Sequence, residues 1–368
     1  MTTSGGTRRV AVAGGGTAGH ILSALDFLEA YRSECGADGY FIGCGSDLEG
    51  RLVPVRGVRL EIIPGLPWAR ERWHGKLRAI ACLPAVVRAA RRILLRERTE
   101  LVIGAGGYAS LGACLAAATL GLPVVVHEAN FAPGLANRML DRIASLVCVG
   151  GAETAAQFRS PAVVTGVPAG KVAGSRRPAE PPWQILVMGG SEGSPLLNRE
   201  APRLFSDLRR GGVAFGVRHL AGRGDRAAIE RAYAGAGLAA RVDGFVDDMV
   251  PVYAGADLAI SSAGARTLAE IAAAGLPSLL VPLPEAANHH QSANARCYRA
   301  HTTAGPIIEN PSDWTAAAAY IETIVRDPHE MRRLGECAGR RSQPNAAGNL
   351  VRACESVLAA RAGAAAER

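Results

Sequence analysis

The sequence predicts an α/β protein with two doubly wound domains, each built on a parallel sheet. Short apolar runs alternate with amphipathic helical stretches along most of the chain, a pattern typical of parallel sheets covered by helices. The alternation stops once, at a stretch rich in Pro, Gly, Arg and Ser (169–183), and then starts again. Each half opens with a strand and a glycine loop, Arg8–His20 in the first half and Gln184–Ser194 in the second. Two domains also suit a length of 368 residues.

These observations divide the chain into four segments. We expect an N-terminal domain over 1–168, a linker over 169–183, a C-terminal domain over 184–345, and a C-terminal helix and tail over 346–368. Ligands of doubly wound sheets bind beyond the carboxyl ends of the strands, so a cleft between the two domains is the expected site.

The expected strands are nearly continuous in Val, Ile and Leu, as in strands buried on both faces. In the first half they follow the opening strand at Tyr40–Gly43, Leu60–Pro64, Leu101–Gly106, Pro123–Glu128, Leu146–Gly150 and Ala162–Pro168. In the second half they follow the strand that starts at Gln184 and lie at Phe215–Gly222, Ala240–Val246, Leu258–Gly264 and Leu276–Pro284.

The first glycine loop, Gly14–Gly19, joins a buried strand to a helix. Unpaired N–H groups and the helix dipole make such a loop suited to phosphate or another anion. The loop satisfies G-x-G-x-x-G, but a dinucleotide site needs an acidic residue at the end of the second strand. That strand ends in Gly43–Gly45, so a dehydrogenase is a poor fit. His20 ends the loop and can take a proton near neutral pH.

Charge and composition restrict the partners and the compartment. The net charge of +8 suggests an anionic partner. The segment Gly65–Arg98 interleaves Trp and Leu with many arginines, which suits either an anionic membrane surface or an ordinary amphipathic helix with a solvated basic face. Nucleic acid is not expected, since aromatic residues are few and no nucleic-acid module is recognisable. The eight scattered cysteines, without C-x-x-C or Cys/His clusters, favour buried thiols in a reducing cytoplasm.

No metal ion and no cofactor are expected, because D-x-D, H-E-x-x-H and G-x-x-x-x-G-K-[ST] are all absent. No run of about 20 apolar residues and no secretory signal are present in the sequence. Without a metal, a leaving diphosphate must be stabilised by backbone N–H groups, helix N-termini or cations. The second glycine loop, Gly189–Gly193, is the best candidate for that task, although it could also be a simple strand–helix turn.

Seven motifs in a fixed order carry a resemblance to a known family. They are GGGTAGH (Gly14–His20), GAGGYAS (Gly104–Ser110), HEANFAPGLANR (His127–Arg138), GGSEG (Gly189–Gly193), FVDDM (Phe245–Met249), SAGARTLAEIAAAGLP (Ser262–Pro277) and HQSANA (His290–Ala295). Together they resemble the MurG-type glycosyltransferases of family 28, which join N-acetylglucosamine from its UDP derivative to a lipid-linked peptidoglycan precursor. The resemblance implies a GT-B fold, with two Rossmann-like domains facing across a cleft. It also implies an inverting, metal-independent reaction on the cytoplasmic face of the cell membrane, where the protein would be peripheral.

The resemblance places a UDP-sugar donor on the second domain. Glu270 would accept both ribose hydroxyls, Phe245 and Val246 would hold the uracil, and Gln291 would contact the sugar. The diphosphate would lie against Gly190, Ser191, Ala265, Arg266 and Thr267.

The acceptor, a polyprenyl or related phospholipid, would lie on the first domain. Its contacts would be Thr17, Gly19, Tyr108 and Asn130, with Asn198 at the cleft. His20 would remove the proton of the acceptor hydroxyl, or would only orient the acceptor's diphosphate or cap the helix. Glu128 is the rival base.

Three departures from the family pattern keep other specificities open. The usual arginine after Gly166–Pro168 is missing, with Lys171 nearby; another usual arginine is Ser262; and the usual glutamine of the second loop is Glu192. Lys171 or Arg266 could compensate. The sequence therefore leaves open a different UDP-hexose or a phosphoglycolipid acceptor of the moenomycin kind. A UDP-N-acetylglucosamine 2-epimerase and a non-catalytic sugar-nucleotide binder also remain possible.

Overall fold

The computed structural model describes residues 8–65, 73–170, 172, 182–284, 286, 289–302 and 304–366, with the backbone alone for 73–80 and 365–366. The chain divides into two compact units: unit 1 comprises 1–168 with 345–368, and unit 2 comprises 169–344. Most of the expected linker, Lys171 and the start of Gly65–Arg98 lie outside the described residues. Among the described residues, no helix has the length and apolar character needed to cross a membrane.

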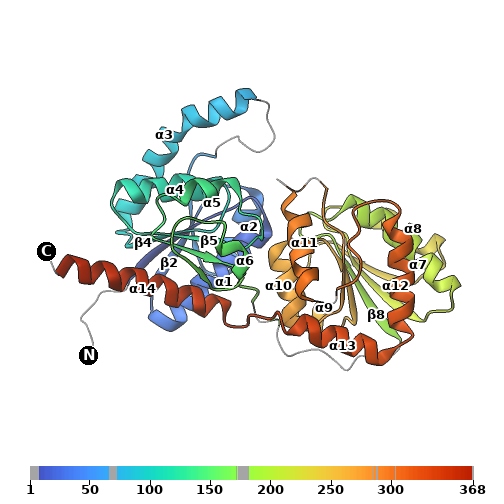
Figure 1. The fold of residues 1–368 in the computed structure, drawn as a ribbon. Coiled ribbons are helices and arrows are strands. Elements are labelled where there is room, and N and C mark those ends of the chain that lie inside the picture. Colours follow the sequence, from blue (N-terminus) through green and yellow to red (C-terminus); the bar gives the residue numbers. More distant parts are fainter. Residues whose placement is uncertain are drawn as a thin grey trace. The chain divides into compact units, whose positions relative to one another are not determined.

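Unit 1 contains a seven-stranded parallel sheet in the order β3-β2-β1-β4-β5-β6-β7 (Figure 1). Its strands are β1 (Arg9–Ala13), β2 (Asp38–Gly43), β3 (Arg59–Ile62), β4 (Leu101–Gly104), β5 (Val124–Glu128), β6 (Leu146–Val149) and β7 (Ala162–Val164). Its helices are α1 (Ala18–Cys35), α2 (Asp47–Val55), α3 (Trp73–Arg96), α4 (Tyr108–Thr119), α5 (Leu135–Leu140), α6 (Ala152–Ala155) and α14 (Ala346–Ala366). The last helix, α14, contacts α1 and β6, so the C-terminal segment completes unit 1.

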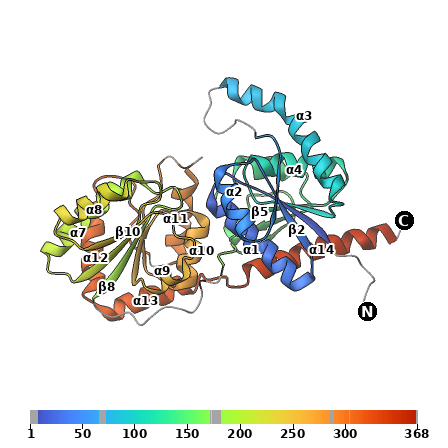
Figure 2. The same ribbon diagram turned by 180° about the vertical axis from the view of Figure 1, so that it is seen from behind.

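Unit 2 contains a five-stranded parallel sheet in the order β10-β9-β8-β11-β12 (Figure 2). Its strands are β8 (Trp183–Met188), β9 (Phe215–Leu220), β10 (Ala240–Asp243), β11 (Leu258–Ser261) and β12 (Ser278–Leu280). Its helices are α7 (Pro195–Arg210), α8 (Arg226–Gly235), α9 (Val250–Ala254), α10 (Ala265–Ala274), α11 (His290–His301), α12 (Asp313–Val325) and α13 (Pro328–Gly339). Both faces of the sheet are covered by apolar clusters.

The predicted fold class, two doubly wound Rossmann-like domains, is confirmed. Each sheet reverses its strand order once, between β1 and β4 in unit 1 and between β8 and β11 in unit 2. Ligand sites of doubly wound folds lie at such switch points, beyond the carboxyl ends of the strands. All eight cysteines are free thiols; three are buried, Cys35 is exposed and the other four are half-buried, so burial was predicted correctly only in part.

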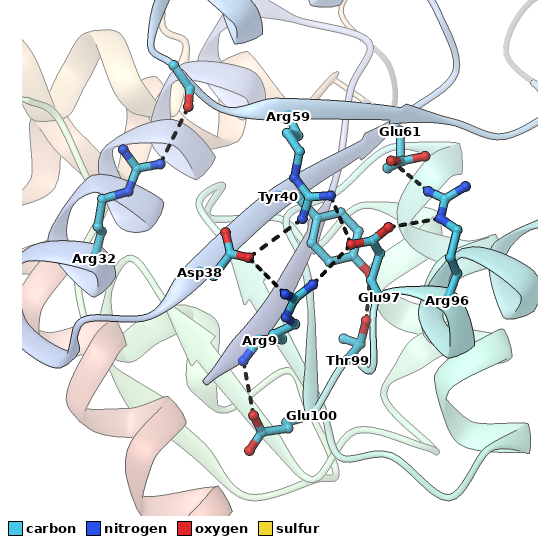
Figure 3. Close-up of polar contacts among 11 residues, drawn as sticks. Arg9, Arg32, Asp38, Tyr40, Arg59, Glu61, Arg96, Glu97, Thr99 and Glu100 are labelled. Carbon is cyan, nitrogen blue, oxygen red and sulfur yellow. Dashed lines mark hydrogen bonds and ion pairs between the residues drawn. The ribbon is translucent and has the colours of Figure 1, made fainter. Parts of the chain in front are cut away.

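An ion-pair network lies at the amino ends of the strands in the unit 1 sheet, opposite the carboxyl ends (Figure 3). Glu97 lies between α3 and β4, and its side chain is only 8% exposed. Its carboxylate is 2.8 Å from Arg96 Nε, 2.9 Å from Arg59 Nη1 and 3.3 Å from Arg9 Nη1. The hydrogen bonds from Arg96 and Arg59 lower the pKa of Glu97. The network therefore connects the starts of β1 and β3 to the end of α3.

Replacing Glu97 with glutamine should lower the unfolding free energy of unit 1 by roughly 2 kcal/mol at pH 7, because three arginines each lose one of their anionic partners. The lowered pKa makes this stabilisation fully present above the unfolded-state pKa and lost as the pH falls through the folded-state value. The difference between the proteins should therefore shrink as the pH falls below about 4. Urea unfolding at pH 7 and in acid measures it, with Glu29→Gln as the control, since Glu29 is 59% exposed in its pair with Arg56. Equal losses in both variants would contradict a special role for Glu97.

Candidate functional site

The first glycine loop fixes the imidazole of His20. Thr17 caps α1, and its Oγ1 accepts a hydrogen bond from His20 N. The ring Nδ1 of His20 lies 3.2 Å from Gly15 O and 3.2 Å from Thr17 Oγ1. A carbonyl oxygen can only accept a hydrogen bond, so these contacts assign the proton to Nδ1 in the neutral ring. The lone pair of the half-buried ring is then on Nε2.

The loop between β4 and α4 packs directly on the first glycine loop. A Cβ on Gly107 would lie 2.9 Å from Gly15 O, and one on Gly106 would lie 3.2 Å from His20 Nε2. Ser110 joins the loops, since its Oγ accepts from Gly106 N at 3.0 Å and donates to Ala13 O at 2.9 Å. Glycines are therefore needed here for the close approach of the two backbones and for space around Nε2.

Tyr108 is the first residue of α4 and is half-buried. Burial raises the pKa of its phenol, so the hydroxyl keeps its proton at neutral pH and can donate a hydrogen bond.

Glu128, at the end of β5, uses its carboxylate to hold the following loop. Oε1 accepts from Asn130 N at 2.9 Å and from Asn130 Nδ2 at 3.1 Å, and Oε2 accepts from Gly134 N at 2.9 Å and from Asn137 Nδ2 at 2.8 Å. The residue is 2% exposed. Four donors around one buried carboxylate indicate a role in shaping the loop that carries Asn130.

The residues predicted for the acceptor side follow three strands that are neighbours in the sheet. Thr17, Gly19 and His20 follow β1, Tyr108 follows β4, and Glu128 and Asn130 end or follow β5. Asn198 lies on α7, in unit 2.

In unit 2, the second glycine loop lies on another glycine turn. A Cβ on Gly193 would be 2.2 Å from Ala221 O, and one on Gly222 would be 2.2 Å from Gly193 N. Gly190 and Gly193 have φ values of 82° and 80°, in the left-handed region. The loop that carries Gly190 and Ser191 is therefore built backbone against backbone.

A second loop, between β11 and α10, lies beside the second glycine loop. A Cβ on Gly190 would lie 3.6 Å from the hydroxyl of Ser262, which is buried. The first residues of α10 are Ala265, Arg266 and Thr267, whose N–H groups have no partner within the helix. The switch point of the unit 2 sheet thus has a glycine loop beside a helix N-terminus, an arrangement that can bind phosphate.

Glu270 is buried on α10, and both its oxygens receive hydrogen bonds. Oε1 accepts from Arg266 Nε at 2.8 Å and Oε2 accepts from Tyr253 OH at 2.8 Å. Burial, followed by the charge of Glu270, raises the pKa of Tyr253 well above its usual range, so this phenol is a permanent donor. The orientation of the carboxylate is therefore fixed by one hydrogen bond at each oxygen.

The other residues predicted for the donor lie on neighbouring loops. Phe245 and Val246 are half-buried after β10. Gln291 is buried, and its Oε1 accepts from Ala263 N at 3.1 Å and from Leu283 N at 3.0 Å. Gln291 therefore connects the β11–α10 loop to the segment that follows β12.

The negative charge of Glu192 is paired. Its Oε2 lies 3.1 Å from Arg223 Nε, and both side chains are exposed. Arg223 N also donates to Glu192 O at 3.2 Å. The departure at Glu192 thus brings an arginine to the edge of the second glycine loop, a pairing that no sequence motif predicted.

Asn198 belongs to a buried network that sequence reasoning missed. Its Nδ2 donates to Ala221 O at 3.2 Å, and its Oδ1 lies 3.0 Å from His219 Nε2. His219 Nδ1 lies 2.8 Å from Tyr233 OH. The carbonyl oxygen of Asn198 requires a proton on Nε2, so Nδ1 accepts from the tyrosine. The network holds the turn on which Gly193 rests, and no motif in the sequence marked His219.

The His219 network should make unit 2 sensitive to acid. Burial lowers the pKa of His219 from 6.5 to about 4. Between these two values the unfolded state binds the additional proton, so stability falls as the pH drops. We expect the unfolding free energy of unit 2 to fall by about 2 kcal/mol between pH 7 and pH 5 because of His219. This pH-dependent loss should be absent in His219→Gln. Urea unfolding followed by tryptophan fluorescence measures it, and the exposed His329 serves as a control through His329→Gln. Retention of the full pH dependence in His219→Gln would assign it to other groups.

Comparison with protein families gives two matches in chain order. The model of the glycosyltransferase family 28 N-terminal domain matches residues 10–149, and that of the family 28 C-terminal domain matches residues 184–330. The chain belongs to glycosyltransferase family 28.

Individual relatives of this glycosyltransferase agree with the assignment. The UDP-N-acetylglucosamine–N-acetylmuramyl-(pentapeptide) pyrophosphoryl-undecaprenol N-acetylglucosamine transferase of Magnetococcus marinus is 35% identical over 363 residues, which cover 95% of this chain and 98% of the relative. The protein of the same name from Xylella fastidiosa is 38% identical and covers 89% of this chain and 90% of the relative. The crystal structure of Acinetobacter baumannii MurG superposes with a TM-score of 0.76 at 26% identity over 95% of this chain and 99% of that one.

A more distant likeness concerns the fold alone. A structure described as a UDP-N-acetylglucosamine 2-epimerase from Listeria monocytogenes has a TM-score of 0.68 at 10% identity, covering 95% of this chain and 96% of that one.

Proposed function

We propose that this family 28 member transfers N-acetylglucosamine from UDP-N-acetylglucosamine to a hydroxyl of a lipid-linked acceptor, with inversion and without a metal ion. The observation that supports it most is the fixed imidazole of His20 at the switch point of one sheet, with a phosphate-type loop at the switch point of the other. The names of the relatives supply the donor and the lipid class.

On unit 2, the donor would be held by groups that are already oriented. Glu270 would accept the two ribose hydroxyls, and its orientation is maintained by Tyr253 and Arg266. The diphosphate would take N–H groups from Gly190, Ser191 and residues 265–267. These donors, with Arg223 nearby, would offset the charge of the leaving UDP without a metal. Phe245 and Val246 would hold the uracil, and Gln291 would contact the sugar.

On unit 1, His20 would act as the base. Nδ1 is committed to Gly15 O, so Nε2 is the atom that can take the proton of the acceptor hydroxyl as the hydroxyl oxygen attacks the anomeric carbon. Thr17, Gly19, Tyr108 and Asn130 would position the acceptor. Glu128 would act through the loop it holds, since four donors already occupy its carboxylate.

An anionic membrane surface would present the acceptor to unit 1. The described part of Gly65–Arg98 has two exposed arginines on α3 one turn apart, Arg88 and Arg92. A groove of about 480 Å³ lies between α3 and α4, lined by Leu83, Pro84, Val87, Leu115, Ala118 and Thr119. Apolar surface beside these arginines suits the boundary between lipid headgroups and acyl chains. The protein would then be peripheral on the cytoplasmic face.

The test of the proposed activity is UDP release that depends on a lipid acceptor. Purified protein is given UDP-N-acetylglucosamine with a polyprenyl-diphosphate-linked saccharide, with a phosphoglycerate-linked saccharide, or with no acceptor. UDP release with the polyprenyl-diphosphate-linked saccharide alone supports the proposal. Release with the phosphoglycerate-linked saccharide alone would identify the acceptor as a phosphoglycolipid. Formation of an epimerised sugar without an acceptor, or tight UDP binding without turnover, would overturn it. Co-sedimentation with anionic rather than zwitterionic vesicles, weakened by salt, tests the membrane contact.

A further inference from the structure

Glu49 is a buried carboxylate with no part in the proposed reaction. It is the third residue of α2 and only 1% exposed. Oε2 accepts from Gly45 N at 2.7 Å and from Ser46 N at 3.0 Å, while Ser46 Oγ accepts from Glu49 N at 3.3 Å. This is a capping box, which most helices form at the protein surface with a solvated glutamate. Here the carboxylate is turned inward.

The inward position brings the carboxylate against the first glycine loop. A Cβ on Gly15 would lie 2.3 Å from Glu49 Oε1, and a Cβ on Gly43 would lie 2.5 Å from Oε2. The carboxylate therefore fills the space beside the Gly15 backbone. One carboxylate oxygen is thus held by Gly45 N and Ser46 N, and the other faces Gly15.

Gly15 connects Glu49 to His20. Its α-carbon packs on the carboxylate, and its carbonyl oxygen lies 3.2 Å from His20 Nδ1. On the other side, Gly107 packs on the same carbonyl. The position of that oxygen is thus set by Glu49 and Gly107 together, and it decides both the tautomer and the orientation of the ring.

We infer that Glu49 is a positioning residue for His20: its carboxylate fixes the Gly15 carbonyl that orients the ring and keeps the proton on Nδ1. Its negative charge also favours the imidazolium that forms when Nε2 accepts the proton of the attacking hydroxyl. This inference rests on the proposed role of His20 as the base.

The first experiment replaces Glu49 with glutamine in the full-length protein. Glutamine keeps the length of the side chain and an oxygen for Gly45 N and Ser46 N, but places an N–H₂ group against Gly15 and removes the charge. We expect kcat to fall about 10- to 50-fold while KM for UDP-N-acetylglucosamine changes less than about twofold. Glu49→Asp, which keeps the charge but withdraws it from Gly15, should show an intermediate loss.

Ser46→Ala is the matched control. It removes the cap on Glu49 N from the same helix and leaves the carboxylate and its two backbone donors in place. It should lower the unfolding temperature like Glu49→Gln but keep kcat within about twofold. If Ser46→Ala loses as much kcat as Glu49→Gln, helix stability explains both results and the inference is overturned.

A double-mutant cycle separates this inference from the proposed function. In His20→Ala protein, Glu49→Gln should cause less than about a twofold further loss, because the group it positions is gone. If the kcat losses of the two substitutions multiply in the double variant, the inference is overturned and His20 remains the proposed base. Retention of activity in His20→Ala would instead refute the base role itself. If Glu49→Gln does not fold, the same cycle is run with Glu49→Asp.

Discussion

His20→Ala should lower kcat by about 10² to 10⁴-fold, the usual loss when a general base is removed. The structure explains why the effect should fall on turnover. Nδ1 is held by Gly15 O and Thr17 Oγ1, so in the proposed reaction Nε2 would accept the proton. The residues proposed for the donor all lie in unit 2, so KM for the UDP-sugar should stay within about threefold.

The measurement is steady-state UDP release at saturating acceptor, with binding of UDP measured separately by calorimetry. His329→Ala, at an exposed position on α13, should leave both values unchanged. Glu128→Gln tests the rival base. A severe loss of kcat in Glu128→Gln, together with a mild one in His20→Ala, would assign the proton transfer to Glu128. Equal losses of turnover and donor affinity in His20→Ala would reduce His20 to an orienting role.

Glu270→Ala should weaken UDP binding about 100-fold, because two charge-assisted hydrogen bonds to the ribose would be lost together. The buried carboxylate is held by Arg266 and Tyr253, so its two oxygens have a fixed orientation. The carboxylate is already ordered before UDP binds, so binding costs it little conformational entropy. Truncating it should therefore cost nearly the full free energy of its contacts with UDP.

Calorimetric titration with UDP measures this loss directly. Tyr253→Phe removes one hydrogen bond to Glu270 but keeps the carboxylate, and should weaken binding less than about fivefold. Because Arg266 loses its partner in Glu270→Ala, Arg266→Ala is needed as a second control. If Arg266→Ala weakens UDP binding as much as Glu270→Ala, the ion pair as a unit, and not the carboxylate alone, holds the nucleotide.

The loops of the site could be predicted from the sequence because the residue types they need depend on local backbone geometry. Runs such as Val124–Glu128 are continuous in β-branched residues, which are typical of strands buried on both faces. Glycines such as Gly190 and Gly193 adopt positive φ values that other residues avoid. Strand, glycine loop and helix in succession therefore predicted both switch-point loops, and the resemblance of seven ordered motifs predicted the family.

The chemistry of individual side chains was decided by tertiary contacts. Ser110 donates to Ala13 O, which is 97 residues away in the sequence, and Asn198 contacts His219 and Ala221 within unit 2. The carboxylate of Glu128 accepts four hydrogen bonds from the loop that follows β5, and none of these donors could be identified from the sequence.

By itself, therefore, the sequence determined the strands, the glycine loops, the two doubly wound sheets and the family, since these follow from residue periodicity and backbone preference within short segments. Only the tertiary structure decided which nitrogen of His20 has the lone pair, that Glu192 is paired with Arg223, and that Glu49 lies against Gly15. The physical reason is that a polar group's protonation and orientation depend on the donors and acceptors that surround it. Those partners come from strands and helices that are adjacent only in the folded chain.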